Sequence, residues 1–510
     1  MADATGARTL LEVLENGAGS HPAIVTPDGP TLTYDGLKAQ IGRLMDQLRS
    51  FGIRRNDRVA MVLPNGIEAI ASFLAVSGVA TAAPLNAAYK PDEFQFYLED
   101  TNARAVITGT QAGEDAVKAA PKGTFHITVA MDKQGEINFS GPPSSGGGSA
   151  DMPSADDVAL VLHTSGTTSR PKRVPLTHRN LTTSLRNVVD TYRLGEGDVS
   201  LCIMPLFHVH GLVASTLSTF QSGGTVVVPQ RFNPLNFWPV AKSHGVTWFS
   251  AVPSMHQALL NRARSRGADD PARGADTLRF IRSCSAALPP SVMLEMEERF
   301  GVPVLEAYGM TEAAHQMASN PLPPTKRLPG SVGPGTGVDV AIMDEAGTLQ
   351  PVGGKGEVVI RGANVTPGYE DNPEANANSF TNGWFRTGDE GVMDAEGYLT
   401  LTGRLKEIIN RSGEKISPRE IDEVLLDHPA VAEAVAFGVP HPTHGEEPSA
   451  AVVLGGEATP AELVAYCRTR LADFKCPRTI HIVDEIPRGA TGKIQRRFVA
   501  EAFSNQAANS

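Results

Sequence analysis

The chain has 510 residues, of which 41% are apolar and 20% charged, the composition of an ordinary globular protein. Since this length exceeds what one hydrophobic core normally organises, it predicts two or more domains. The net charge of −11 argues against a nucleic-acid partner, because phosphate backbones are bound by clustered Lys and Arg.

The first part of the chain alternates between helical and strand patterns. Residues 31–52 predict a helix with Thr33 as N-cap and Gly52 just beyond its C-cap. Its apolar residues recur on one face at the helical period: Leu37, Ile41, Leu44, Leu48 and Phe51. Residues 58–64 predict a buried strand and 69–80 another helix. This alternation continues to about residue 400 and indicates α/β layers.

The last hundred residues have the pattern of a separate, small α+β unit. They contain a helical pattern near 417–427, strand patterns near 431–439 and 449–454, and a second helical pattern near 460–472. We therefore predict an N-terminal domain over residues 1–403 and a C-terminal domain over 404–510. The single low-complexity stretch, residues 141–155, predicts a flexible surface loop.

Cysteine usage and the chain ends predict a cytoplasmic protein with no membrane partner. The four cysteines form no CxxC pair, and no histidine cluster has the spacing of zinc ligands. We therefore expect reduced thiols. The N-terminal segment lacks the pattern of a secretory signal, and no apolar stretch approaches the roughly 20 residues that cross a bilayer. The C-terminal AANS is not a peroxisomal address.

A polar turn, TSGTTSRPK at residues 164–172, follows the short apolar strand 158–163. Hydroxyls, exposed amides and a lysine are what a polyphosphate needs. The turn is not a Walker A loop, since Pro171 stands where that pattern has its second glycine. By composition alone, a Ser/Thr-rich surface turn is the alternative. The candidate phosphate contacts are Thr164, Ser165, Gly166, Thr167, Thr168 and Lys172.

This turn closely resembles the AMP-binding signature of the adenylate-forming superfamily, which includes acyl-CoA synthetases, aryl-CoA ligases, luciferases and peptide-synthetase adenylation domains. Arg173 departs from the family, which usually has glycine there. Further motifs follow in the family's order and spacing: RSCSAAL (282–288), EAYGMTE (306–312), GWFRTGD (383–389), LTGRLKE (401–407), SGEKISP (412–418) and PRGATGKI (487–494). The resemblance covers essentially the whole chain. It implies an α/β fold with a large N-terminal domain of several sublobes and a small, mobile α+β C-terminal domain.

The resemblance implies a nucleotide site. Tyr308 would stack on adenine, Thr311 would contact the α-phosphate, and Glu312 would hold Mg²⁺, a hard cation that prefers carboxylate oxygens. Asp389 and Arg404 would hold the ribose. Taken singly, Tyr308 could be a core aromatic and Glu312 a solvated charge. The other implied nucleotide contacts are Ser285, Ala286, Ala287, Glu306, Ala307 and Gly309.

The implied reaction joins a carboxylic acid to CoA through an acyl-adenylate, with ATP, CoA and Mg²⁺ taking part and with AMP and pyrophosphate released. Lys493 would be the catalytic lysine of adenylation, where two like-charged reactants need added positive charge. Lys406 would be the hinge about which the C-terminal domain rotates between the two half-reactions. Ser412 and Gly413 would line the CoA tunnel after that rotation.

Three segments resemble the oxalate–CoA ligase branch: PLFHVHG (205–211), RSCS (282–285) and MTEAAHQM (310–317). His208, His210, Ser283 and His315 would make polar an acid pocket that is mostly apolar in fatty acyl and aryl members. A second buried carboxylate needs such partners. His208 is alternatively the family's usual gate residue, and His210 a satisfied core histidine. A medium-chain or aryl acid–CoA ligase, a carrier-loading adenylation enzyme and an inactive nucleotide-binding scaffold are the rival interpretations.

Overall fold

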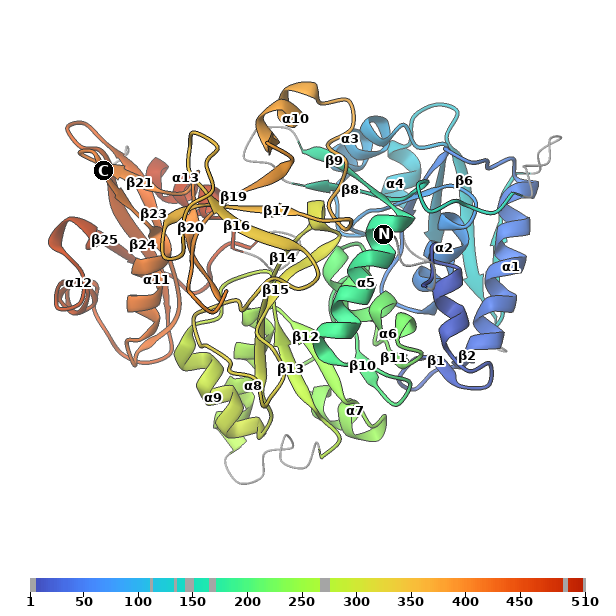
Figure 1. Cartoon of the computed structure of the whole chain (residues 1–510), viewed down its shortest axis with the longest axis horizontal. Helices are drawn as coiled ribbons and strands as arrows, with labels where there is room; N and C mark the ends of the chain where they lie inside the picture. The colour runs from blue at the N-terminus through green and yellow to red at the C-terminus, as the bar shows by residue number, and fades with distance from the viewer. Residues whose placement is uncertain are drawn as a thin grey trace.

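The structure, a computed structural model, describes residues 6–110, 113–132, 135–142, 151–164, 171–266, 276–488 and 494–507. Its helices and strands form an α/β fold of four sheets, three in the larger N-terminal part and one in a smaller C-terminal part (Figure 1). The predicted fold class is confirmed. Among the described helices, none combines the length and the apolar character needed to cross a bilayer.

A seven-stranded sheet lies nearest the beginning of the chain, in the order β7-β6-β5-β3-β4-β8-β9. Its strands are β3 (Arg58–Val62), β4 (Thr81–Pro84), β5 (Ala105–Gly109), β6 (Phe125–Met131), β7 (Ile137–Ser140), β8 (Val158–Thr164) and β9 (Lys172–Thr177). The helices associated with it are α1 (Tyr34–Ser50), α2 (Ile67–Ser77), α3 (Pro91–Thr101) and α4 (Glu114–Ala119). The helices predicted over 31–52 and 69–80 are α1 and α2, but residues 31–33 form strand β2 instead, and α2 begins two residues earlier and ends three residues earlier than predicted.

Helix α1 begins where the sequence predicts. The Thr33 hydroxyl accepts a hydrogen bond from the Gly36 amide, which satisfies one of the free donors of the first turn. The helix ends at Ser50 with Phe51 as its C-cap, and Gly52 follows with a left-handed φ of 83°. Both predicted boundary residues are confirmed.

An eight-stranded sheet carries the centre of the molecule, in the order β15-β14-β13-β12-β10-β11-β1-β2. Its strands are β1 (Pro22–Val25), β2 (Thr31–Thr33), β10 (Val199–Leu201), β11 (Thr225–Val227), β12 (Trp248–Ala251), β13 (Phe280–Ser283), β14 (Val304–Met310) and β15 (His315–Ser319). Its helical elements are η1 (Glu12–Asn16), α5 (His178–Tyr192), the π-helix η2 (His210–Leu217), α6 (Ser218–Gln221), α7 (Phe237–Ser243), α8 (Pro253–Arg266), α9 (Pro290–Phe300) and η4 (Thr311–Ala313).

Strands β12, β13 and β14 pair in parallel, so their carboxyl ends meet at one edge of this sheet. Ligands of open α/β sheets bind at such edges. The strands themselves are buried and the side chains that follow them become progressively exposed, as at Ala286 and Ala287 after β13. This edge is where the predicted nucleotide and acid residues gather.

A third, antiparallel sheet comprises β16 (Asp339–Met343), β17 (Lys355–Arg361), β18 (Phe380–Thr381), β19 (Trp384–Met393) and β20 (Leu399–Arg404), with α10 (Pro373–Ser379) beside it. Strand β20 ends at Arg404, and the next strand already belongs to the C-terminal sheet. The domain boundary between residues 403 and 404 stays a prediction.

The C-terminal part, orange to red at one end of the molecule in Figure 1, has its own hydrophobic core, which includes Ile421, Leu425 and Val452. Its strands are β21 (Ile409–Arg411), β22 (Glu414–Ile416), β23 (Val431–His441), β24 (Gly445–Leu454) and β25 (Thr479–Ile482). Its helical elements are α11 (Pro418–Leu426), α12 (Pro460–Arg468), η5 (Asp473–Lys475) and α13 (Arg496–Ala507). All four elements predicted in this region are present, although β24 begins four residues before the predicted strand.

The cysteines Cys202, Cys284, Cys467 and Cys476 are buried free thiols, as expected. Most of the predicted flexible loop, residues 143–150, lies outside the described residues.

Candidate active site

The phosphate-loop candidate connects the two strands of a β-hairpin. Strands β8 and β9 pair antiparallel, and Thr164 faces Lys172 as the last pair. Ser165, Gly166, Thr167 and Thr168 lie outside the described residues. The structure therefore places the two ends of the turn and leaves the contacts between them as predictions.

Lys172 is held beside an aromatic ring that sequence reasoning missed. Its Nζ lies 4.5 Å from the centroid of the Tyr369 ring, within cation–π distance. Burial and the nearby Lys406 lower the pKa of Lys172, while the carboxylate of Glu312 opposes this shift. A cation with Lys406 beside it is suited to an anionic ligand such as a polyphosphate.

Glu312 is a buried carboxylate next to this lysine. It lies in the short η4 turn after β14 and accepts a hydrogen bond from the Tyr369 hydroxyl at 2.8 Å. Burial raises its pKa, with Tyr369 and Lys172 acting in the opposite direction. A buried carboxylate oxygen is a ligand that fits Mg²⁺. Thr311, half-buried, precedes it at the start of the same turn.

The predicted adenine and ribose residues form one hydrogen-bonded group. Strand register sets Asp389 on β19 opposite Arg404 on β20, and Arg404 Nε donates to Asp389 Oδ1 at 2.8 Å. The Tyr308 hydroxyl donates to the other oxygen, Oδ2, at 2.5 Å. Burial and Asp389 raise the pKa of Tyr308 well above its usual value. Sequence reasoning thus chose three residues that the tertiary structure brings into contact.

Glu306, on β14, is the most unusual ionisable group of this edge. It is 1% exposed, one oxygen accepts from the Leu288 amide at 2.9 Å, and within the described structure the other oxygen has no hydrogen-bond partner. Burial raises its pKa to about 7. Ala307 and Gly309 flank Tyr308 on the same strand. A Cβ at Gly309 would lie 2.1 Å from the His315 carbonyl oxygen, so glycine is required there.

Two of the predicted acid-pocket histidines come together. The His210 and His315 rings lie 5.2 Å apart between centroids. His210 Nδ1 is 3.0 Å from Ser285 Oγ, and Nε2 is 2.6 Å from Ser250 Oγ. Ser285 is half-buried, with a left-handed φ of 77° that turns the chain out of β13.

The other two acid-pocket candidates, His208 and Ser283, lie in different surroundings. His208 is half-buried and packs against Phe207, with ring centroids 5.3 Å apart, just before the π-helix that begins at His210. Ser283 is fully buried at the end of β13, and its hydroxyl makes no hydrogen bond within the described residues.

Arg282 lies between His210 and His315 and belongs to the RSCSAAL motif, but the sequence alone predicts no role for it. It is fully buried and hydrogen-bonds Tyr192, Ser250 and Gln316. A charged residue directly after the apolar Phe280 and Ile281 in strand β13 was the available signal. Ser250 and Tyr369 carried no comparable signal, since Ser and Tyr are unremarkable at their positions.

The C-terminal candidates are only partly described. Lys493 lies outside the described residues, as do its neighbours from 489 on. Lys406 is exposed, two residues beyond the end of β20. Ser412 and Gly413 form the exposed turn between β21 and β22, where Ser412 Oγ lies 2.8 Å from His444 Nδ1. The hinge and tunnel roles stay predictions.

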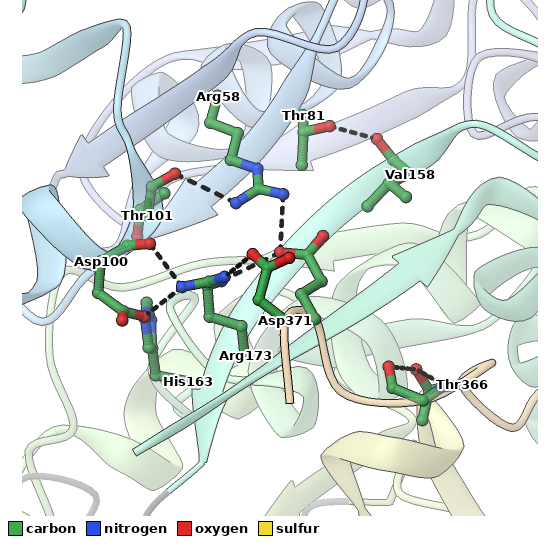
Figure 2. Close-up of polar contacts among 11 residues, drawn as sticks. Arg58, Thr81, Asp100, Thr101, Val158, His163, Arg173, Thr366 and Asp371 are labelled. Carbon is green, nitrogen blue, oxygen red and sulfur yellow. Dashed lines mark hydrogen bonds and ion pairs between the residues drawn. The ribbon is translucent and has the colours of Figure 1, made fainter. Parts of the chain in front are cut away.

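Arg173, which departs from the family pattern, anchors strand β9 of this hairpin (Figure 2). Its guanidinium binds Asp100 at the end of α3 (2.9 Å) and Glu370 in the loop before α10 (3.1 Å), and it also pairs with Asp371. Its main-chain oxygen accepts from the Glu370 amide. The arginine therefore joins three segments that are distant in sequence.

Both partners of Arg173 have further contacts. Asp100 binds His163 Nε2 at 3.0 Å, and Glu370 pairs with Arg58 at 2.7 Å. Burial opposes ionisation of Asp100, but hydrogen bonds from Arg173 and His163 outweigh it and lower the pKa of this carboxyl. Burial lowers the pKa of His163, so the imidazole is neutral near pH 7.

Comparison with protein families matches this architecture in two blocks. Residues 12–370 match the model of the AMP-binding enzymes, and residues 420–493 match that of the AMP-binding enzyme C-terminal domain. The second block includes the predicted catalytic lysine.

Similar proteins span nearly the same length. The oxalate–CoA ligase of Arabidopsis thaliana is 47% identical, over 97% of this chain and 98% of that protein. The oxalate–CoA ligase of Saccharomyces cerevisiae is 43% identical, over 96% and 95%. Among solved structures, ATP-bound MatB from Rhodopseudomonas palustris superposes with a TM-score of 0.87 at 29% identity, covering 98% of this chain and 99% of that one.

Proposed function

Because the chain belongs to the family of AMP-binding enzymes, we propose that oxalate is the acid it joins to CoA. The enzyme is an AMP-forming, ATP-dependent acid–CoA ligase, as its similarity to such ligases along nearly the whole chain establishes. We propose the identity of the acid, the site of Mg²⁺ and the roles of the individual residues. A cytoplasmic location stays a prediction.

The observation that carries the choice of acid is the polar, buried cluster beside the nucleotide residues. His210 Nε2 and His315 Nδ1 each lie within 3.5 Å of a nitrogen of the Arg282 guanidinium. A fatty acyl or aryl tail gains nothing from such a wall, whereas a second carboxylate needs hydrogen-bond donors and positive charge once it leaves water. This favours a short acid with a second anionic group over the medium-chain and aryl alternatives.

In the first half-reaction, one carboxylate of oxalate attacks the α-phosphorus of ATP, and pyrophosphate leaves. The reactants repel each other, so the site has to supply positive charge. Lys172 stands at the phosphate hairpin, and Lys493 is assigned the same task on the C-terminal domain. Glu312 would hold Mg²⁺, which neutralises charge on the phosphates when bound. Asp389 would accept the ribose hydroxyls.

In the second half-reaction, the CoA thiolate attacks the acyl carbon of oxalyl-adenylate, AMP leaves, and oxalyl-CoA forms. We assign to Lys406 the pivot that withdraws Lys493 and brings the turn at Ser412 and Gly413 toward the acyl group.

A substrate panel tests the proposal. Acid-dependent pyrophosphate release is measured with ATP, CoA and each of oxalate, malonate, octanoate and 4-coumarate, and the CoA thioester is identified by mass. We expect the highest kcat/KM with oxalate. A higher value with octanoate or 4-coumarate would remove oxalate as the substrate while leaving the ligase chemistry in place.

A further inference from the structure

Arg282 is a buried cation without a carboxylate partner in the part of the chain that the structure describes. None of its surface is exposed. Its guanidinium donates to the neutral acceptors Tyr192 Oη (2.8 Å), Ser250 Oγ (2.9 Å) and Gln316 Oε1 (3.1 Å). An arginine cannot relieve the cost of burial by losing its proton, and an unbalanced buried charge is expensive. A ligand anion would therefore balance it well.

Two series of hydrogen bonds, here called arms, lead away from Arg282: one through Ser250 and His210, the other to His315. In the first arm, the contacts of Ser250, on β12, decide which atom donates each hydrogen bond. Because its oxygen accepts from Arg282 Nη1, its hydroxyl proton is available for His210 Nε2, which lies 2.6 Å away. Arg282 Nη1 itself approaches the same ring nitrogen at 3.5 Å. Since neither neighbour leaves room for a proton on Nε2, this nitrogen is the acceptor, and Nδ1 carries the proton of the neutral ring.

That proton points out of the core. His210 Nδ1 lies 3.0 Å from Ser285 Oγ, so the ring donates to Ser285, whose own hydroxyl proton can then face a ligand. Donation runs from Arg282 through Ser250 and His210 to Ser285. The first three residues are buried, and Ser285 is half-buried where the chain leaves β13. The direction of this arm is thus set from the buried end.

The second arm is shorter. Arg282 Nη2 lies 3.4 Å from His315 Nδ1, so this nitrogen accepts and the ring proton sits on Nε2. His315 has a left-handed φ of 114° at the start of β15, directly after the turn that holds Glu312. Both arms therefore turn a proton donor away from the guanidinium.

From this geometry, and resting on the proposed function, we propose that Arg282 is the positioning residue for the second carboxylate of a short dianionic acid. It orients Ser285 through Ser250 and His210, it orients His315 directly, and its buried charge balances that of the carboxylate. An acid with an uncharged tail makes no use of the arrangement. Discrimination between the two kinds of acid should thus depend on Ser250, which is not itself assigned to any ligand.

The test uses the intact enzyme with Ser250→Ala, because replacing the fully buried Arg282 could prevent folding. Ser250→Thr keeps the hydroxyl and serves as the rescue variant. Ser200→Ala is the matched control: Ser200 is also buried, lies on the adjacent strand β10, and its hydroxyl donates to the Ser215 carbonyl at 3.4 Å. For each variant, pyrophosphate release gives kcat/KM for oxalate and for propionate.

We expect Ser250→Ala to lower kcat/KM for oxalate about 10- to 100-fold, the range for losing one charge-assisted hydrogen bond. Propionate use should stay within about threefold of wild type, a spread well under the factor of ten that 1.4 kcal/mol produces. Ser250→Thr should recover oxalate use, and Ser200→Ala should match wild type.

The outcomes separate this proposal from the proposed function. If wild type prefers oxalate but Ser250→Ala lowers both acids equally or neither, the positioning role is refuted and the substrate stands. If wild type prefers another dianionic acid, oxalate is wrong. The ratio of kcat/KM for that acid to kcat/KM for propionate, compared between wild type and Ser250→Ala, then tests the positioning role of Arg282. If wild type prefers propionate, both proposals fail.

Discussion

Replacing Arg173 by Met should weaken the N-terminal part of the enzyme, because it removes the cation that joins the phosphate hairpin to α3 and to the loop before α10. The side chains of Arg173, Asp100 and Glu370 are 11%, 10% and 15% exposed, so this is a largely buried ion cluster. Methionine keeps much of the volume and the strand backbone while removing the charge.

The size of the stability loss depends on the partners that Asp100 and Glu370 retain without Arg173. Breaking a buried pair costs roughly 3–5 kcal/mol when it leaves a charge unpaired. Here Glu370 retains Arg58, and Asp100 retains a hydrogen bond from His163. We therefore expect a loss of about 2–3 kcal/mol, below the full penalty. Asp371 adds little, since it is 86% exposed.

Thermal unfolding followed by tryptophan fluorescence measures this loss in the right part of the chain, because all three tryptophans lie at positions 238, 248 and 384. The melting temperature should fall by about 2–6 °C. The KM for ATP should rise, since the hairpin carries the predicted phosphate loop. The control is Arg179→Ala on neighbouring α5, which removes an exposed ion pair with Asp156 and should change little.

The pH dependence of the melting temperature tests whether the ion pair of Arg173 with Asp100 stabilises the fold. The folded-state pKa of Asp100 is lowered, so its pairing stabilises the protein above the unfolded pKa of about 4 and is lost as pH falls through the lowered value. The difference between wild type and Arg173→Met should shrink across that acid window. Equal melting temperatures at pH 7, or a difference that persists unchanged under acid conditions, would show that the cluster does not stabilise the fold as described.

Four further predictions address the remaining assignments. Lys493→Ala should lower adenylation about 10²- to 10³-fold but largely spare thioester formation from preformed oxalyl-adenylate; equal loss of both half-reactions would contradict its assigned role. Lys406→Pro, which restricts φ to near −65°, should impair one half-reaction much more than the other, and two near-normal rates would move the pivot elsewhere. His315→Ala should weaken oxalate use by about 2–5 kcal/mol and narrow the gap to propionate with little change in ATP affinity; full oxalate activity would remove His315 from the acid site. The pKa of Glu306 is raised to about 7, so the folded state binds its proton more tightly than the unfolded state, and wild type should lose stability as pH rises from about 4.5 to 7 relative to Glu306→Gln; parallel melting curves across that range would exclude the buried carboxyl as the cause.

Local patterns predicted much of the fold. The N-cap at Thr33 and the glycine at position 52 were readable because both act through the hydrogen bonds of the residues next to them. The strand before the phosphate loop and the four C-terminal elements were readable because burial of one face imposes a period on the sequence. The early start of β24 was not predicted, because residues 445–448 extend the strand through pairing with β23 rather than through an apolar pattern of their own.

The nucleotide residues were predicted by resemblance, and their contacts came from the fold. Tyr308, Asp389 and Arg404 lie on three different strands, and pairing of β19 with β20 sets two of them opposite each other. Tyr369, which binds Glu312 and lies under Lys172, was missed because no neighbouring residue marks it. The path of the chain alone places it there.

The sequence by itself determined the family, the order of the motifs and the α/β class, because each depends on contiguous residues or on a short period. Only the tertiary structure decided the surroundings of Arg282. Its partners Ser250, Gln316 and Tyr192 are 32, 34 and 90 positions away along the chain. Whether a buried arginine meets carboxylates or neutral acceptors depends on which strands pack beside it, and no local pattern encodes that choice.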